Sequence, residues 1–186
     1  MSQTFQIANL KPGDFTEEII ALDTNVLYWF FYASGLTYNK PSTINKLQSY
    51  GQFIQDLISN DAFLITTTIN INELMHLIEK NEFKLYCYLN NKNISFKDYR
   101  RITAERNRLC TLCQIVYLQI KQIIYIANIQ FNDKLIDNYI NSIKNYRLDC
   151  LDYVLLNYCL NENINYILTD DKDFEGYNIN CDVIKM

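Results

Sequence analysis

Short apolar runs alternate with longer segments of helical periodicity along most of the chain. Apolar runs bounded by polar residues predict strands at 19–22, 63–66, 166–169 and 181–184. Between these runs, apolar residues recur every three or four positions, which is typical of helices packed on one face. Strands that alternate with helices indicate a parallel sheet covered on both sides. The pattern therefore predicts an α/β fold of three α/β/α layers with a mostly parallel central sheet.

The middle of the chain departs from this alternation. One long helix is predicted from about 98 to 127 and another from about 135 to 146, so we expect a helical insertion at about 81–147 within a single domain, 1–186. After the insertion, the segment 148–160 is apolar nearly all round and predicts a buried helix. A turn containing Gly176 precedes the last strand.

Carboxylates occur in four stretches of the chain, close to where predicted strands meet helices. Parallel strands present their carboxyl ends at one edge of a sheet, which is where open α/β sheets bind ligands. Carboxylates gathered there raise each other's pKa values unless a cation neutralises them, and a hard divalent ion does so with oxygen ligands. The pattern thus predicts a divalent-metal site. The acids concerned are Asp23, Glu73, Asp149, Asp152, Asp171 and Asp173.

Each of these acids also has an ordinary structural interpretation. Asp149 is favoured slightly more as a helix N-cap than as a ligand, and Asp23 is also compatible with a simple turn. For Asp171, an acidic turn and a ligand are equally good interpretations. His76 is the only histidine, and we expect it to pack or to face solvent, because a metal-activated water needs no histidine base.

Composition narrows the class of protein. With 186 residues, a hydrophobic fraction of 49% and a charged fraction of 20%, the chain fits one ordinary globular domain. No opening segment combines basic residues with the apolar run of a secretory leader, and no apolar run is long enough to span a bilayer, so we expect a soluble, cytoplasmic protein with no membrane partner. The six cysteines are expected to be reduced and mostly buried, and the pair Cys110 and Cys113 to pack within a helix.

Charge is unevenly distributed. The net charge of -4 argues against a protein that coats nucleic acid. Between 92 and 108, however, six basic residues are accompanied by two acidic ones, Asp98 and Glu105, so six minus two leaves a local excess of +4. Phe96 and Tyr99 lie in the same stretch and could stack on bases. A solvated helix face explains the stretch equally well. The basic residues are Lys92, Lys97, Arg100, Arg101, Arg106 and Arg108.

The acidic motifs, taken together and in chain order, resemble those of the PIN-domain nucleases. The resemblance covers about 18–80 and 148–186, from Leu22-Asp23-Thr24-Asn25 to Thr169-Asp170-Asp171-Lys172-Asp173-Phe174. It implies a metal-dependent endoribonuclease that hydrolyses RNA phosphodiester bonds with one or two Mg²⁺ or Mn²⁺ ions. The implied catalytic and metal-binding quartet is Asp23, Glu73, Asp152 and Asp171, with Asn25, Asp149, Thr169 and Asp173 in support.

The resemblance also suggests partners and leaves alternatives open. Glu73 and Asp152 are 152 minus 73, or 79, positions apart, which is long for the compact toxins of this family, so a toxin and an RNA-processing enzyme are both open. RNA is the expected partner, bound by Lys97, Arg100, Arg101, Arg106 and Arg108, and an antitoxin protein or a second copy is suggested by the toxin members. One alternative is a non-catalytic RNA-binding or scaffold domain. A haloacid-dehalogenase-like phosphatase is another, although such an enzyme needs a second Asp where this chain has Asn25.

Overall fold

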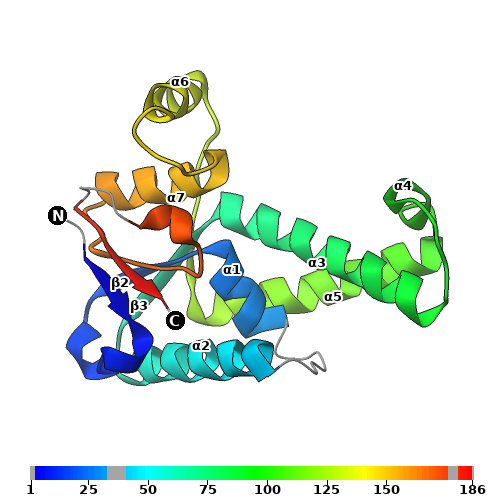
Figure 1. The fold of residues 1–186 in the computed structure, drawn as a ribbon, viewed down its shortest axis with the longest axis horizontal. Helices are drawn as coiled ribbons and strands as arrows, with labels where there is room; N and C mark the ends of the chain where they lie inside the picture. Colours follow the sequence, from blue (N-terminus) through cyan, green and yellow to red (C-terminus); the bar gives the residue numbers. More distant parts are fainter. Residues whose placement is uncertain (1–2, 33–40, 176–179, 186) are drawn as a thin grey trace.

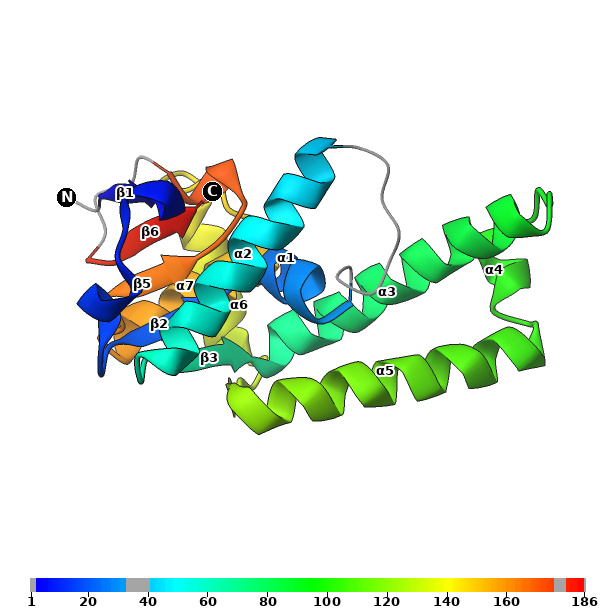
Figure 2. The same ribbon diagram turned by 90° about the horizontal axis from the view of Figure 1, so that it is seen from below.

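The computed structural model describes residues 3–32, 41–175 and 180–185, with the side chains of 41 and 42 left aside. Its centre is one parallel sheet with the strand order β1-β6-β5-β2-β3-β4 (Figures 1 and 2). The strands are β1 (Thr4–Gln6), β2 (Ile19–Leu22), β3 (Phe63–Thr67), β4 (Tyr125–Ala127), β5 (Tyr166–Leu168) and β6 (Asp182–Lys185).

Helices connect the strands and cover the sheet. The α-helices are α1 (Thr24–Leu27), α2 (Pro41–Ser59), α3 (Thr68–Leu89), α4 (Phe96–Tyr99), α5 (Thr103–Ile123), α6 (Asp133–Ser142) and α7 (Cys150–Asn161). Shorter helical turns are η1 (Ile7–Asn9), η2 (Pro12–Phe15), the π-helical η3 (Tyr28–Tyr32) and η5 (Lys172–Phe174).

Alternate residues of the central strands enter two separate cores. In β2, Ile20 and Leu22 pack with α1, α2, α3 and α5, whereas Ala21 packs with α7 on the other face. In β5, Leu168 belongs to the first core and Ile167 to the second. Because side chains alternate between the faces of a strand, both faces of the sheet are buried. The predicted three-layer α/β/α fold with a parallel sheet is confirmed.

The middle of the chain forms an arm that projects from the body. The arm consists of the distal part of α3 together with α4 and α5. It extends away from the sheet, with α4 near its tip (Figures 1 and 2). The long helix predicted at about 98–127 is observed as α5, but it is shorter at both ends. Ile102 is extended, with φ -81 and ψ 102, and separates α4 from α5. Beyond α5, the segment 125–127 pairs with β3, so the predicted insertion contains a strand as well as helices.

The other boundaries lie close to the predicted ones. β2 matches the predicted 19–22, β3 and β5 end within one residue of their predicted ends, and β6 is shifted by one residue. The helix predicted at 135–146 is observed as α6, with Asn132 as its N-cap. Strand β1 was not predicted. The predicted turn at Gly176 lies outside the described residues.

Two expectations about composition can be compared with the structure. All six cysteines are free, but only Cys159 and Cys181 are buried, so the expectation of mostly buried thiols is wrong. Cys110 and Cys113 do lie within helix α5, where Cys110 is exposed and Cys113 is half-buried. Within the described residues, no helix combines the length and the apolar character needed to cross a membrane.

Candidate active site

Asp23 lies at the carboxyl end of β2 and is almost fully buried, with 1% of its surface exposed. Its Oδ1 accepts a hydrogen bond of 2.6 Å from the backbone N–H of Thr24, and its Oδ2 accepts one of 2.7 Å from the hydroxyl of Thr169. These donors come from the start of α1 and from the end of β5. The carboxylate is therefore held between two neighbouring strands, at the edge where parallel sheets bind ligands.

Glu73 is tied to the same edge through a buried chain of polar groups. The Thr24 hydroxyl donates to Glu73 Oε2 at 2.6 Å and accepts from the Asn70 side-chain amide at 3.0 Å. The side-chain Oδ1 of Asn70 in turn accepts a hydrogen bond of 2.6 Å from the Thr67 hydroxyl. Thr24, Asn70 and Thr67 are all buried. This chain of hydrogen bonds fixes the position of Glu73 relative to Asp23.

Thr24 and Asn70 belong to the site although the sequence did not predict them there. Thr67 is the N-cap of α3, because its side chain accepts a hydrogen bond from the backbone N–H of Asn70 at 3.2 Å. A capping Thr followed three residues later by a polar side chain is the signal that points to Asn70. The signal predicts the cap but not the contact between Asn70 and Thr24.

Thr169 links Asp23 to Asp171. Its hydroxyl donates to Asp23 and accepts from the backbone N–H of Asp171 at 2.9 Å. Asp171 Oδ1 accepts from the backbone N–H of Asp173 at 2.8 Å and so caps η5. Asp171 is half-buried, whereas Asp173 is exposed. The supporting position predicted for Thr169 therefore has a structural basis in these two hydrogen bonds.

The two acids at the start of α7 have different environments. Asp149 is the exposed N-cap, and its Oδ1 accepts from the backbone N–H groups of Leu151 at 2.8 Å and Asp152 at 2.9 Å. The capping interpretation of Asp149 is thus confirmed. Asp152 is half-buried in the first turn of the helix. Of the pair, Asp152 is the one whose pKa is raised by the charges of Asp23, Asp171 and Glu73.

Burial and mutual repulsion raise the pKa values of two of these acids. Burial raises the pKa of Asp23 to about 7 in spite of the hydrogen bonds from Thr169 and Thr24, and the charges of Glu73 and Asp171 raise it further.

Asp152 shows the same effect. Burial raises its pKa to about 8, and the charges of Asp23, Asp149, Asp171 and Glu73 add to the increase. The charges of Glu73 and Asp171 thus act on both Asp23 and Asp152, which brings the four predicted acids together at one edge of the sheet.

The chemistry of the converging groups suits a hard cation. All four are carboxylates, and oxygen ligands are those that Mg²⁺ and Mn²⁺ prefer. The nearest described ion pair is that of Lys46 with Asp170, at 2.5 Å, and no described salt bridge joins a Lys or Arg to the quartet. Across the described part of the chain, no three His, Cys, Asp or Glu side chains already surround one point at metal-binding distance.

No model of a known protein family matches the chain, and no curated protein matches it either. The geometry of this edge and the motifs that build it are therefore what bears on function.

Two other residues from the sequence analysis lie near or beyond this edge. Asn25 is half-buried in α1, and none of the described hydrogen bonds involves its side chain. His76 is exposed on α3, with its Nδ1 at 3.7 Å from Glu79 Oε2 in the arm. His76 therefore faces solvent, which is one of the two environments expected for it.

The basic stretch between 92 and 108 pairs with acids of the protein itself. Arg100 and Arg106 both contact Glu79, at 2.5 Å each. Arg108 lies 2.5 Å from Glu82 and 2.9 Å from Glu105. Two of these acidic partners, Glu79 and Glu82, come from α3. They lie outside the stretch 92–108, so the local charge counted from the sequence did not include them. With four acids instead of two, the local excess is six minus four, or +2.

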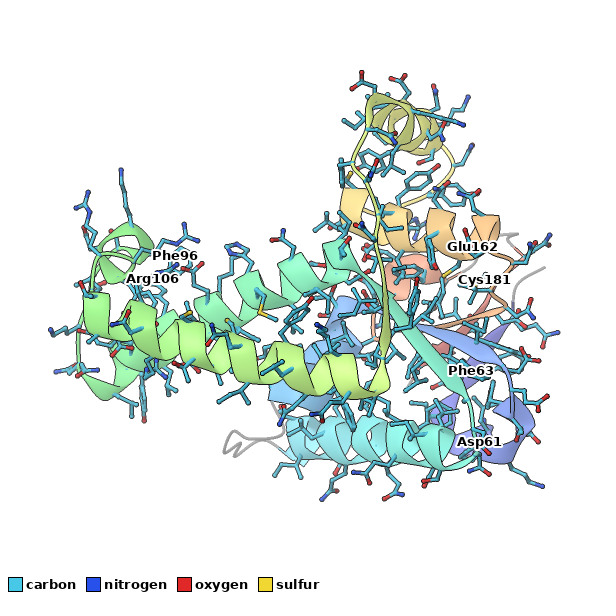
Figure 3. The ribbon with its side chains drawn as sticks, turned by 180° about the vertical axis from the view of Figure 1, so that it is seen from behind. Asp61, Phe63, Phe96, Arg106, Glu162 and Cys181 are labelled. Atoms are coloured by element: carbon cyan, nitrogen blue, oxygen red, sulfur yellow. The ribbon has the colours of Figure 1, made fainter. Side chains whose placement is uncertain are left out.

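The remaining members of the stretch are also accounted for in part. Arg101 pairs with Asp98 at 3.1 Å, and the Arg100 guanidinium lies over the Phe96 ring at 4.3 Å from its centre. Phe96 and Arg106 lie together at the far end of the arm (Figure 3). Tyr99 is fully buried, so it cannot stack on a base as the sequence suggested. The arginines here hold α4 and α5 onto α3, which is a different role from a solvated face.

Proposed function

We propose that the protein is a divalent-metal-dependent ribonuclease whose quartet, Asp23, Glu73, Asp152 and Asp171, holds one or two Mg²⁺ or Mn²⁺ ions. The observation that carries this proposal is the convergence of four carboxylates from four chain segments, with the pKa of Asp23 raised to about 7 and that of Asp152 to about 8. Such an arrangement is costly unless a cation binds, and acid clusters of this kind are typical of functional sites.

The bound metal would supply hydroxide near neutral pH and would offset charge that builds on the phosphoryl oxygens. The chain's own contribution is to orient the ligands. Thr169 and the Thr24 N–H hold the Asp23 carboxylate, and the Thr24 hydroxyl holds Glu73. Ligands fixed in this way lose little freedom when an ion binds. In-line hydrolysis would leave a 5′-phosphate and a 3′-hydroxyl.

RNA is proposed as the substrate because the same four acids, in the same chain order, carry the resemblance to the PIN-domain nucleases. A phosphatase of the haloacid-dehalogenase kind is disfavoured by Asn25, which stands where that chemistry requires a second Asp. The all-oxygen character of the site favours a hard ion and argues against zinc, which prefers nitrogen and sulfur ligands.

The experiment compares two substitutions at opposite ends of α7. Asp152→Asn removes a quartet carboxylate, whereas Glu162→Gln removes one at the exposed far end of the same helix. Structured and single-stranded RNAs are incubated with Mn²⁺, Mg²⁺ or chelator, and the products are analysed by gel and by end-group chemistry. We expect Asp152→Asn to lose cleavage by about 100-fold or more and Glu162→Gln to retain it. Cleavage that survives chelator or Asp152→Asn would refute the proposal, and metal binding without cleavage would favour a non-catalytic RNA-binding domain.

A further inference from the structure

Helix α6 stands apart from the body and touches it along one face. It lies over α7, as Figure 1 shows, and packs there through Leu135 and Tyr139. The Tyr139 ring lies 5.7 Å from that of Tyr153 in α7. A helix of 10 residues is too short to be stable in water without packing. Contacts made by α6 therefore decide whether it persists.

A second apolar face of α6 is exposed. Ile136, Ile140 and Ile143 are 40%, 58% and 55% exposed. They follow each other at intervals of four and three, which places them in one stripe along the helix. Ile143 keeps helical backbone angles, φ -52 and ψ -36, so the stripe continues through the C-cap. This stripe is distinct from the face that packs on α7, and contiguous exposed apolar side chains of this kind mark interaction surfaces.

The charges beside the stripe show what could cover it. Asp137 precedes Ile140 by three positions, and Lys144 follows it by four. Both are exposed, and neither takes part in a described salt bridge. An identical helix packed antiparallel, with a two-fold axis near Ile140, brings Ile136 opposite Ile143 and Asp137 opposite Lys144 of the second copy. The same flank of each helix meets in such a pair, so both ion pairs form at once.

We propose that α6 is a self-association surface, on which α6 of a second copy packs antiparallel across Ile136, Ile140 and Ile143. The flank of the stripe is complementary to itself in charge, which a surface for an unrelated partner need not be. It is also small. Interfaces that bury less than about 1,200 Å² are typical of transient complexes, so we expect a reversible dimer with a dissociation constant weaker than about 1 μM. This proposal goes beyond the nuclease function and does not depend on it.

The experiment is sedimentation equilibrium over a range of protein concentrations, using the full chain and a charge swap. Asp137→Lys or Lys144→Asp alone places like charges opposite each other, and we expect either to weaken association by about tenfold. The double variant Asp137→Lys/Lys144→Asp exchanges the two charges and should restore association.

Ile140→Glu, at the centre of the stripe, should abolish association, whereas Ile115→Glu, an exposed isoleucine of α5 that is 50% exposed, should not change it. Circular dichroism confirms that each variant is folded. A wild-type protein that is monomeric throughout, an Ile140→Glu variant that associates normally, or a double variant that fails to recover would each overturn the proposal. Metal-dependent cleavage by Ile140→Glu provides a separate readout of the proposed nuclease function.

Discussion

The sheet edge and the arm both bury carboxylates, but they neutralise them differently. In the arm, Glu79 is 7% exposed and contacts Arg100 and Arg106, and the hydrogen bond from Arg100 leads the effects that lower its pKa. At the edge, Asp23 is 1% exposed and is bonded only to neutral donors, and its pKa is raised to about 7. The arm thus supplies its own positive charge, whereas at the edge no Lys or Arg of the described residues forms a salt bridge with the four acids.

This difference separates the acids that the fold itself neutralises from the acids of the proposed metal site. An acid that is buried beside arginines has a complete explanation in the fold. Acids that are buried beside each other raise the free energy of the folded state at neutral pH, and a cation from outside offsets that cost. The comparison therefore favours the edge as the place of the proposed metal site, although the arm contains more charged side chains.

The largest expected effect is that of Asp23→Asn, which removes a charge from the edge. Folding raises the pKa of Asp23 from 3.8 to about 7. In the metal-free protein, protonated Asp23 therefore stabilises the folded state at low pH, and this contribution to stability is lost as the pH rises through about 7. The neutral side chain avoids that loss. Without metal at pH 8, we expect the variant to melt at a higher temperature than the wild type, while Mn²⁺-dependent cleavage falls by about 100-fold or more. A variant that is less stable than the wild type at pH 8 yet fully active would contradict the proposed difference between the edge and the arm.

Glu79→Ala should have the opposite effect on stability. It leaves Arg100 and Arg106 without their shared partner, and since both arginines are about half exposed we expect a loss of about 2 kcal/mol in the free energy of unfolding. Asp98→Ala is the control, because its pair with Arg101 is exposed and is worth about 0.5 kcal/mol. Urea unfolding measures both. Cleavage per folded molecule should be unchanged in both variants, and a selective loss of cleavage in Glu79→Ala would show that the arm takes part in the chemistry.

A smaller effect is expected at Thr24, which orients Glu73 without being a proposed ligand. Thr24→Val keeps the volume but removes the hydroxyl that bonds Glu73 and Asn70, and we expect the Mn²⁺ concentration for half-maximal cleavage to rise by about tenfold. Thr24→Ser retains the hydroxyl and should behave almost as wild type. Equal effects of the two substitutions would show that packing of the methyl group, and not the hydrogen bonds, is what matters.

The alternation of apolar runs predicted most of the fold. Strands β2, β3, β5 and β6 coincide with runs that are visible in the sequence, because each is buried on both faces. Strands β1 and β4 were missed, since both are three-residue strands at the two edges of the sheet and are only partly buried. The residues of β4 also continue the apolar pattern of α5. Their strand conformation depends on the free edge of β3, which no local pattern encodes.

The acids of the site were predictable because topology brings the carboxyl ends of parallel strands together. The chain of hydrogen bonds through Asn70 was not, since an Asn in the first turn of a helix is ordinary in sequence and its contact with Thr24 spans 46 positions. The excess of positive charge in the arm was overestimated for a similar reason. Glu79 lies 21 positions before Arg100 and 27 before Arg106, outside any window used to count local charge.

The central claim is that the acids at the sheet edge share a divalent cation. Calorimetric titration of the metal-free protein with Mn²⁺ tests it directly, when it is run at pH 7 in two buffers of different ionisation enthalpy so that released protons are counted. Because the pKa values of Asp23 and Asp152 are raised to about 7 and about 8, binding should expel protons at pH 7, with less expelled as the pH rises above 8. Saturable binding with this proton release, lost in Asp23→Asn, is the predicted result. Absence of saturable binding, or binding that releases no protons and survives Asp23→Asn, would contradict it.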